Sequence, residues 1–228
     1  MNGNDLTIFA VNHNTPLLIY ALMKSLRKQN PWCDSVLHII DNSSKKELPE
    51  IETGNFIVEY FDNALYKNLE TFAAKTKSGP LGSAHHAFTI DWFIKNRVKT
   101  DYLLLVDSDI VFTDNFEKYF DDFVKNDYIL MGYKRTTYRC TTIAPWCCFV
   151  NVKKLKELRL SYFDINRILY VNDNQTHDTG ASLYEDAIGL GCKIRELPND
   201  LFTRHLKCGS SSPQKHKAFL SGLKKYIS

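Results

Sequence analysis

One apolar run constrains the fold of this chain more than any other feature. Residues 102–106 (Tyr-Leu-Leu-Leu-Val) carry no charge, and the run stops at Asp107 and Asp109. A short run of this kind is typical of a strand that is buried on both faces, and such strands belong mainly to parallel sheets covered by helices. We therefore expect a layered α/β fold built around this strand.

Strand-like and helix-like patterns alternate through the first half of the chain, which indicates a mostly parallel sheet with right-handed crossovers. Thr15 and Ser83 suit the N-caps of two helices, and Pro16 suits a first turn. The second half is less regular. The predicted strands are 6–11, 36–40, 55–61, 102–106, 129–132, 148–151 and 193–197, and the predicted helices are 16–30, 83–92, 153–158 and 181–189.

Composition excludes several classes of protein. The chain has 228 residues, of which 44% are hydrophobic and 24% charged, as in a globular protein rather than a disordered or fibrous one. A net charge of +3 gives no reason to expect a nucleic-acid partner. Neither a membrane span nor a secretory signal is recognisable, so we expect a cytoplasmic protein whose six cysteines are free thiols. No linker marks a boundary, and we expect one domain over 1–228.

Polar side chains follow the predicted strands at the point where each strand ends. Asp107 and Asp109 follow the apolar strand, while Asn12 and Asp41 follow the first two strands. The carboxyl ends of parallel strands share one edge of the sheet, and ligands of α/β folds bind beyond it. Two carboxylates spaced i, i+2 can converge on one hard cation such as Mg²⁺ or Mn²⁺. The sequence therefore predicts a cation site at this edge; the alternative is a turn whose acids are solvated.

Two classes of enzyme place a pair of acids in this way. One is the phosphatase or phosphotransferase of the haloacid dehalogenase (HAD) type, in which Asp107 would become phosphorylated, and Ile110-Val111-Phe112 is compatible with that pattern. That motif usually opens its domain, whereas here a long stretch of alternating strands and helices precedes it. No convincing set of a lysine and an acid follows it. The phosphatase remains an alternative.

The other class is the nucleotide-sugar glycosyltransferase. Three motifs in order resemble family 2 glycosyltransferases of the GT-A type: 6–14 (Leu-Thr-Ile-Phe-Ala-Val-Asn-His-Asn), 39–44 (Ile-Ile-Asp-Asn-Ser-Ser) and 107–109 (Asp-Ser-Asp). The segment 82–88 (Gly-Ser-Ala-His-His-Ala-Phe) occupies the place of that family's helix before the acidic pair. The resemblance covers most of the chain and is strongest in the first 115 residues. It implies the GT-A fold, a Rossmann-like, mostly parallel central sheet flanked by helices.

The resemblance also implies binding residues. Asp41 corresponds to the acid that reads a uracil edge, and His13 to a ring near the base. Asp107, Asp109 and the late histidine His205 correspond to ligands of Mn²⁺ or Mg²⁺, and an imidazole suits Mn²⁺ somewhat better. For the histidines, a purely structural place is the alternative. The expected donor contacts are Val11, His13, Asn14, Asp41, Ser83, His86, Ser108 and Lys207.

The proton acceptor is the residue on which this chain departs from the family. An inverting transferase needs a carboxylate that takes the proton of the acceptor hydroxyl. The family commonly has an acidic pair ahead of a helix and a glycine, and this chain has Asp178-Thr179-Gly180 instead. We expect Asp178 to be the base, with Glu185 or Asp186 as alternatives. A further interpretation makes Asp178 only the cap of the following helix.

Together these resemblances imply a metal-dependent, inverting glycosyltransferase that moves a sugar from a nucleotide diphosphate, expected to be UDP, to a hydroxyl acceptor in polysaccharide or glycolipid synthesis. Residues 1–112 would bind the donor and 113–228 a glycan or lipid-linked acceptor, with Trp146 in the acceptor wall. The basic tail after Ser210 is amphipathic, so it either packs on the domain as a helix or contacts an anionic membrane surface. The alternative to an enzyme is a non-catalytic protein that binds a nucleotide sugar or glycan.

Overall fold

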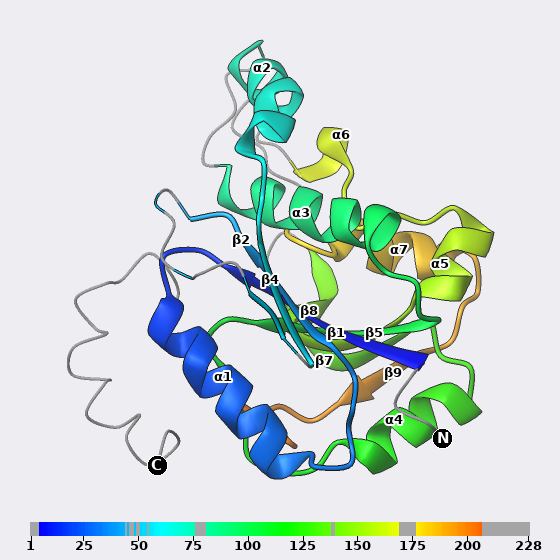
Figure 1. The fold of residues 1–228 in the computed structure, drawn as a ribbon. Helices are drawn as coiled ribbons and strands as arrows, with labels where there is room; N and C mark the ends of the chain where they lie inside the picture. The colour runs from blue at the N-terminus through cyan, green and yellow to red at the C-terminus, as the bar shows by residue number, and fades with distance from the viewer. Residues whose placement is uncertain are drawn as a thin grey trace.

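The computed structural model describes residues 5–43, 45, 48, 51–53, 55–75, 81–137, 140–168 and 177–206. Two sequence predictions, a donor contact at Lys207 and a membrane contact through the basic tail, lie outside the described residues. Within the described residues, the strands form an eight-stranded sheet and a separate two-stranded ribbon (Figure 1).

The large sheet is mostly parallel. Its strands are β1 (Leu6–Asn12), β2 (Leu37–Asp41), β3 (Ile51–Thr53), β4 (Phe56–Tyr60), β5 (Tyr102–Asp107), β7 (Leu130–Thr136), β8 (Thr141–Asn151) and β9 (Ile194–Leu197). They lie in the order β3-β4-β2-β1-β5-β8-β7-β9. Strands β4, β2, β1 and β5 pair in parallel, as do β7 and β9, whereas β3 and β8 run against their neighbours. The antiparallel ribbon is formed by β6 (Ile110–Phe112) and β10 (Thr203–His205).

Helices cover both faces of the large sheet (Figure 1). One face carries α1 (Pro16–Gln29) and α4 (Glu117–Lys125). The other face carries α2 (Lys67–Lys75), α3 (Gly82–Asn96), α5 (Val152–Leu158), α6 (Ile165–Ile168) and α7 (Ala181–Gly189). A 3₁₀ turn, Asn63–Tyr66, leads from β4 into α2. The result is the three-layer arrangement expected of an α/β fold.

The central strand β5 shows why both helical layers are needed. Leu103 and Leu105 belong to the hydrophobic cluster that includes α3 and α7, whereas Leu104 and Val106 belong to the cluster that includes α1 and α4. All four side chains are completely buried. Because successive side chains of a strand point to opposite faces, an apolar residue at every position is what two-sided burial requires.

The predicted fold class is confirmed, and so are most predicted elements. Strands β1, β2 and β5 and helix α1 begin and end within two residues of the predicted ranges. One of the two cap predictions is confirmed in position. Thr15 is the N-cap residue of α1, although its side chain makes no capping hydrogen bond. The prediction for Ser83 is wrong, because Leu81 is the N-cap residue of α3 and Ser83 lies inside the first turn.

The structure also contains elements that the pattern did not predict. Helix α4 buries Phe120 and Phe123, and their spacing from Phe116 is a helical pattern that the sequence does contain. Strands β6 and β10 are too short to show a periodicity, and they exist because they pair with each other. Strand β8 begins at Thr141 rather than at Cys148.

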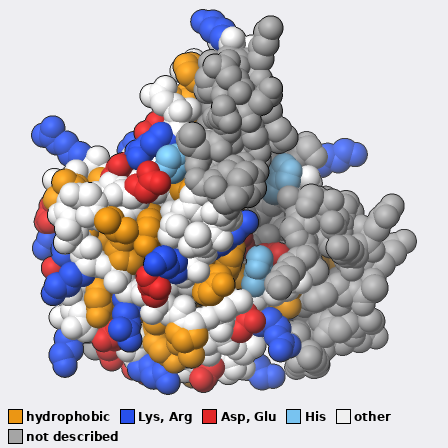
Figure 2. All heavy atoms as spheres, turned by 180° about the vertical axis from the view of Figure 1, so that it is seen from behind, with side chains coloured by type: hydrophobic (Ala, Val, Ile, Leu, Met, Phe, Trp, Pro, Cys, Tyr) orange, Lys and Arg blue, Asp and Glu red, His pale blue; other side chains and the backbone are white. Residues whose placement is uncertain are grey.

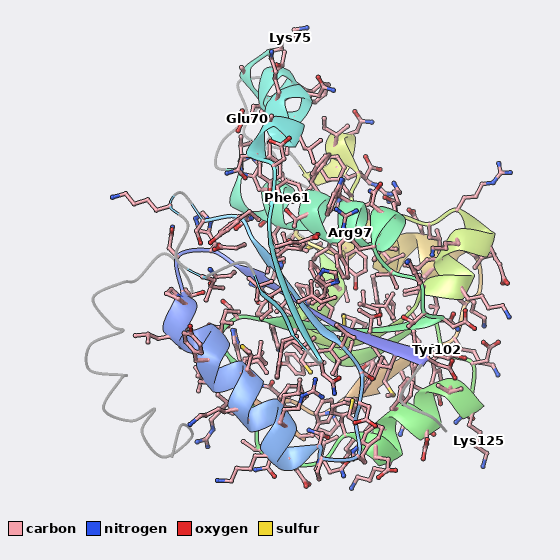
Figure 3. The ribbon with its side chains drawn as sticks, viewed as in Figure 1. Phe61, Glu70, Lys75, Arg97, Tyr102 and Lys125 are labelled. Atoms are coloured by element: carbon pink, nitrogen blue, oxygen red, sulfur yellow. The ribbon has the colours of Figure 1, made fainter. Side chains whose placement is uncertain are left out.

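Aromatic packing secures the connection after β4. The Phe61 ring lies 4.9 Å from the Tyr66 ring and 5.2 Å from the Trp92 ring, measured between centroids, and so joins the sheet edge to α3. Figure 3 shows Phe61 at this junction, with Glu70 and Lys75 on α2 beyond it, away from the sheet. The connection from β4 is therefore held against α3, in the helical layer that covers one face of the sheet.

The surface carries mixed charge. On the face shown in Figure 2, lysine and arginine side chains are interspersed with acidic and apolar ones over the described atoms. Over the described atoms of that face, the two signs of charge are therefore mixed. Among the residues that the structure describes, no helix is long and apolar enough to cross a membrane.

Candidate functional site

Three neighbouring parallel strands end together at one edge of the large sheet. Asn12 at the end of β1 pairs with Asp41 at the end of β2, and Val11 pairs with Asp107 at the end of β5. This is the carboxyl edge, beyond which ligands of α/β folds bind. The register therefore gathers the polar strand ends that the sequence pattern placed there.

Three potential metal ligands meet at this edge. One ligand atom from each of Asp107, Asp109 and His205 lies within 4.8 Å of the others. The antiparallel pairing of His205 with Ile110 brings the late histidine beside Asp109, and its Nε2 lies 3.1 Å from Asp109 Oδ1. The backbone N–H of Leu206 donates to the Asp109 carbonyl at 2.9 Å, which ties the end of β10 to the acidic turn.

The donor set suits a divalent cation. Two carboxylates and an imidazole are ligands that bind Mn²⁺. Metal–ligand distances of about 2.1 Å place the ligands of one ion within about 4.2 Å of each other, so a small contraction would let the cluster hold an ion.

Burial raises the pKa of the Asp107 carboxyl above its ordinary value, and the charge of Asp109 adds to this, while His86 and His205 act in the opposite direction. A bound cation would favour the charged form of Asp107.

The second strand contributes a buried carboxylate, Asp41, which is 2% exposed. Its Oδ1 accepts hydrogen bonds from Asn12 Nδ2 at 2.9 Å and from the Ser43 backbone N–H at 3.0 Å. Its Oδ2 is buried and has no hydrogen-bond partner among the described residues. A buried carboxylate oxygen without a donor is costly, so this atom is a candidate acceptor for an N–H of a ligand.

Asn12 ties the strand ends together. Its side-chain oxygen accepts from the backbone N–H of Thr15 at 3.2 Å and lies 2.9 Å from Thr15 Oγ1. The same hydroxyl lies 2.9 Å from Ser108 Oγ. The Thr15 side chain therefore bridges β1 to the turn that carries the acidic pair, which is why this N-cap residue of α1 makes no capping hydrogen bond with its side chain.

Three further residues at the end of β1 are predicted to contact the nucleotide-sugar donor, and two of them are exposed while the third is in the core. His13 is exposed, and its Nδ1 lies 3.1 Å from Asn42 Oδ1. Asn14 is exposed too, and its backbone N–H donates to Ser43 Oγ at 2.7 Å. Val11 is 9% exposed and belongs to a hydrophobic cluster, so its side chain packs in the core. A donor contact at Val11 is therefore restricted to its main chain.

Helix α3 and the turn before α7 meet beside the metal-ligand cluster. His86 Nε2 on α3 lies 3.7 Å from Asp107 Oδ1. Ser83 Oγ, in the first turn of α3, donates to Asp178 Oδ1 at 2.6 Å, and Arg135 Nη1 on β7 donates to Asp178 Oδ2 at 3.2 Å. The charge of Asp178 also raises the pKa of Asp107, so the two carboxylates lie within electrostatic range of each other.

The side chain of Asp178 does not cap α7. The N-cap of α7 is Gly180, whose φ of +81° favours glycine. Asp178 Oδ1 accepts from the backbone N–H of its neighbour Thr179 at 2.8 Å, in the turn before the helix. The interpretation of Asp178 as a helix cap is therefore wrong.

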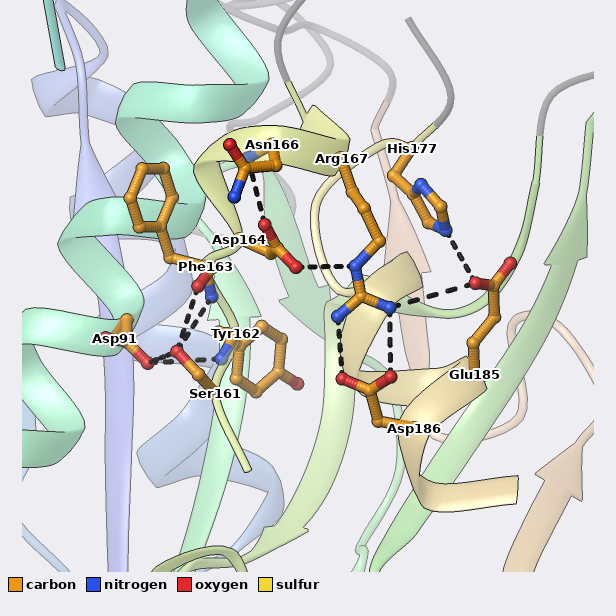
Figure 4. A network of polar contacts seen from close by, with 10 residues as sticks. All are labelled: Asp91, Ser161, Tyr162, Phe163, Asp164, Asn166, Arg167, His177, Glu185 and Asp186. Carbon is orange, nitrogen blue, oxygen red and sulfur yellow. Dashed lines mark hydrogen bonds and ion pairs between the residues drawn. The ribbon is translucent and has the colours of Figure 1, made fainter. Parts of the chain in front are cut away.

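The two alternative bases are engaged in a separate network (Figure 4). Arg167 of α6 donates to both carboxylate oxygens of Asp186, at 2.9 and 2.7 Å. His177 Nε2 lies 2.7 Å from Glu185 Oε2, and Asp164 accepts from Arg167 Nε at 2.6 Å. Glu185 and Asp186 thus join α7 to α6 and to the turn before α7.

Trp146 packs against a residue of the site, and the two cysteines that follow it are buried. The Trp146 ring on β8 stacks on the His205 ring, with centroids 5.0 Å apart and planes at 11°, so part of its surface is used inside the site. Burial raises the pKa of the Cys147 and Cys148 thiols to about 12, which makes both poor nucleophiles at neutral pH. The described cysteines are free thiols, as expected.

Two residues that contact the predicted site residues were not themselves predicted to belong to the site, Arg135 and Ser43. Arg135 reaches Asp178 because β7 lies next to the turn before α7, and no local pattern could indicate this. Ser43 lies two residues after Asp41 and donates its backbone N–H back to that carboxylate. This is a local turn geometry that the Asp-x-Ser spacing does favour.

Comparison with solved structures assigns this arrangement to a known fold. The galactosyltransferase LgtC, in complex with donor and acceptor sugar analogs, matches 83% of this chain and 72% of its own, with a TM-score of 0.53 and 14% identity. Mouse xyloside xylosyltransferase 1 matches 98% of this chain and 94% of its own, with a TM-score of 0.52 and 10% identity. The mannosyltransferase PcManGT from Pyrobaculum calidifontis, in complex with GDP-Man and Mn²⁺, matches 86% of this chain and 55% of its own, with a TM-score of 0.53 and 11% identity.

At these identities the similarity shows the fold alone: the chain has the GT-A fold. Membership of family 2, which the sequence motifs resemble, stays a prediction. No protein-family model and no curated protein matches the chain.

Proposed function

We propose that this chain, which has the GT-A fold, is a metal-dependent glycosyltransferase that moves a sugar from a nucleotide diphosphate to a hydroxyl of a glycan or lipid-linked acceptor. The observation that carries the proposal is the convergence of Asp107, Asp109 and His205 at the carboxyl edge of the sheet. Structural neighbours bound to GDP-Man and Mn²⁺, and to donor and acceptor sugar analogs, support the class of ligand.

The three converging residues would hold the cation, Mn²⁺ or Mg²⁺. A cation bound there would act as a Lewis acid and neutralise the diphosphate of the departing nucleotide. The chain's own contribution is to keep the ligands in place. The pairing of β6 with β10 positions His205, and the contact of Thr15 with Ser108 holds the acidic turn against β1.

The nucleoside of the proposed donor is uridine. Asp41 Oδ1 is occupied by Asn12 and Ser43, so only Oδ2 is left to accept from a base. Uracil presents one N–H between two carbonyl groups, whereas guanine presents two adjacent N–H donors that engage both oxygens of a carboxylate. A single available oxygen therefore favours uracil. His13 and Asn14 lie at the exposed end of the neighbouring strand, where they can contact the rest of the nucleotide.

Asp178 is the proposed proton acceptor of an inverting reaction. The acceptor hydroxyl attacks the anomeric carbon, the bond from that carbon to the diphosphate oxygen breaks, and the hydroxyl proton passes to Asp178. Of the two carboxylate oxygens, Oδ1 accepts from Ser83 and Thr179, whereas Oδ2 accepts from Arg135 alone among the described residues. Oδ2 is therefore the oxygen better placed to take a proton.

A turnover assay tests the proposal. Wild-type protein is incubated with a panel of nucleotide sugars and Mn²⁺, and the release of nucleoside diphosphate is measured. We expect release from a UDP-sugar, lowered about a hundredfold or more by Asp107→Asn or Asp109→Asn because the phosphate charge is no longer neutralised. Asp178→Asn should lower it by about 100- to 10,000-fold, the range for loss of a general base. The control is Asp121→Asn, an exposed residue of α4.

Each alternative has its own outcome. Turnover that survives the loss of both motif acids contradicts the proposal. Donor binding without turnover identifies a non-catalytic nucleotide-sugar binder, and a covalent phosphoaspartate at Asp107 identifies the HAD-type phosphotransferase. If turnover is lost in the Asp107 and Asp109 variants but survives in Asp178→Asn, the protein is still a glycosyltransferase, but Asp178 is not its base. The anomeric configuration of the product, read by NMR, tests inversion.

A further inference from the structure

Trp146 contacts both ends of the proposed site. It lies on β8 and is half-buried, and its ring is nearly parallel to the His205 ring, with centroids 5.0 Å apart and planes at 11°. The guanidinium carbon of Arg135 lies 5.7 Å from the centroid of the same indole. Arg135 in turn donates to Asp178. One indole therefore lies between the late histidine and the arginine that holds the proposed base.

The backbone alone does not determine where the His205 ring points. Pairing with Ile110 and the hydrogen bond from the Leu206 N–H to Asp109 position the main chain at the end of β10. The ring can still rotate about its side-chain bonds. The parallel stack on Trp146 restricts that rotation, and in the stacked orientation His205 Nε2 lies 3.1 Å from Asp109 Oδ1.

We propose that Trp146 is a positioning residue for the metal centre: its indole holds the His205 imidazole in the plane from which Nε2 binds a cation together with Asp107 and Asp109. A histidine ligand needs an outer partner that orients its ring, and loss of such a partner typically lowers metal affinity about 10- to 100-fold. Here a ring stack is one such orienting contact. The inference rests on the proposed function for its cation, but metal binding can be measured without turnover.

The test uses Mn²⁺ alone with the full chain, and free Mn²⁺ is measured by electron paramagnetic resonance during titration. We expect Trp146→Ala to weaken Mn²⁺ binding about tenfold or more, whereas Trp146→Phe, which keeps a ring, stays within about threefold of wild type. The matched control is Trp92→Ala. Trp92 is also half-buried, and its ring packs against the Phe61 ring and the Arg97 guanidinium, as the Trp146 ring packs against His205 and Arg135. No contact joins Trp92 to Asp107, Asp109 or His205 among the contacts of the described residues.

A double-mutant cycle separates positioning from general destabilisation. If Trp146 acts through His205, then Trp146→Ala should not weaken Mn²⁺ binding further in a protein that already carries His205→Ala. Equal losses in Trp146→Ala and Trp92→Ala, or additive losses in the cycle, would overturn the inference, as would a wild-type protein that binds no Mn²⁺. If wild type binds Mn²⁺ and the cycle holds while no nucleotide sugar turns over, the glycosyltransferase proposal fails and the positioning role stands.

Discussion

Single residues of this protein show where local pattern ends and long-range contact begins. Asn12 is completely buried, and its side chain contacts Asp41 and Thr15. Its position at a strand end is a local property that the sequence shows. Its partner Asp41 is 29 residues away, and the contact exists because β1 and β2 pair in a register that places the two strand ends side by side. The polar character of the edge is therefore predictable, whereas its hydrogen bonds are not.

The burial of Cys147 and Cys148 should make the folded protein less stable at high pH. Burial raises the pKa of each thiol from 9.0 to about 12, so between these values the unfolded chain has lost protons that the folded chain keeps. The free energy of unfolding should then fall as the pH rises, by about 1.4 kcal/mol per pH unit for each thiol, and should not respond to these groups below pH 8. Urea unfolding at a series of pH values measures this slope. A Cys147→Ala, Cys148→Ala protein with an unchanged slope would contradict the assignment.

At the scale of elements, the contacts between α6, α7 and the turn before α7 are organised by one arginine. Arg167 joins α6 to α7 through Asp186, and its carbonyl accepts from the His177 backbone N–H at 3.0 Å. His177 is itself held by Glu185. These contacts hold His177 in place, and His177 directly precedes Asp178 in the turn before α7. The sequence contains these charged residues, but only the packing of α6 beside α7 shows that they pair with each other.

The two ends of α7 give a matched pair of glycine substitutions. Gly180→Ala should lower the free energy of unfolding by about 1–2 kcal/mol, because a left-handed φ of +81° is unfavourable for alanine. A Cβ there would also lie 3.1 Å from Thr142 Oγ1 and 3.2 Å from Tyr162 Cε1. Gly189→Ala should be neutral or stabilise by about 0.5–1 kcal/mol, since no atom lies within 4 Å of its Cβ position and alanine favours the helix. Urea unfolding measures both, and a loss of the same size in both variants would contradict this account.

At the scale of the whole molecule, the net charge of +3 conceals an uneven distribution. Asp107, Asp109 and Asp178 gather at one edge of the sheet, and the pKa of Asp107 is raised because burial and its acidic neighbours disfavour its charged form. An edge that concentrates carboxylates is less stable on its own than with a cation beside them. The fold therefore creates a site whose charge a bound cation would balance.

Mn²⁺ should accordingly stabilise the whole fold. At a free concentration one hundred times the dissociation constant, the ion should add about 2.7 kcal/mol to the free energy of unfolding. For a chain of this size that corresponds to a rise in Tm of about 5–10 °C. Thermal unfolding with Mn²⁺, and again after EDTA, measures the shift. Asp109→Asn should abolish the shift and Asp121→Asn should keep it, and a full shift in Asp109→Asn would contradict the site.

By itself the sequence determined the layered α/β class, the central strand and the edge at which the acids lie. These follow from local periodicity: the run before Asp107 is buried on both faces, and Leu18, Leu22 and Leu26 bury one face of α1. The resemblance of the motifs added the GT-A fold, which the structural comparisons confirm.

The family resemblance implied that His205 joins Asp107 and Asp109, and the tertiary structure decided how: His205 reaches Asp109 through the ribbon of β6 and β10. Only the tertiary structure decided that Arg135 reaches Asp178 and that Trp146 stacks on His205. Thr15 is the N-cap residue of α1 without a capping hydrogen bond from its side chain, and Ser83 lies inside the first turn of α3. The hydroxyl of each contacts a residue far away in the chain. The physical reason is the same in each case. Periodicity reports which face of an element is buried, whereas a contact between distant residues depends on strand register and on which surfaces pack together.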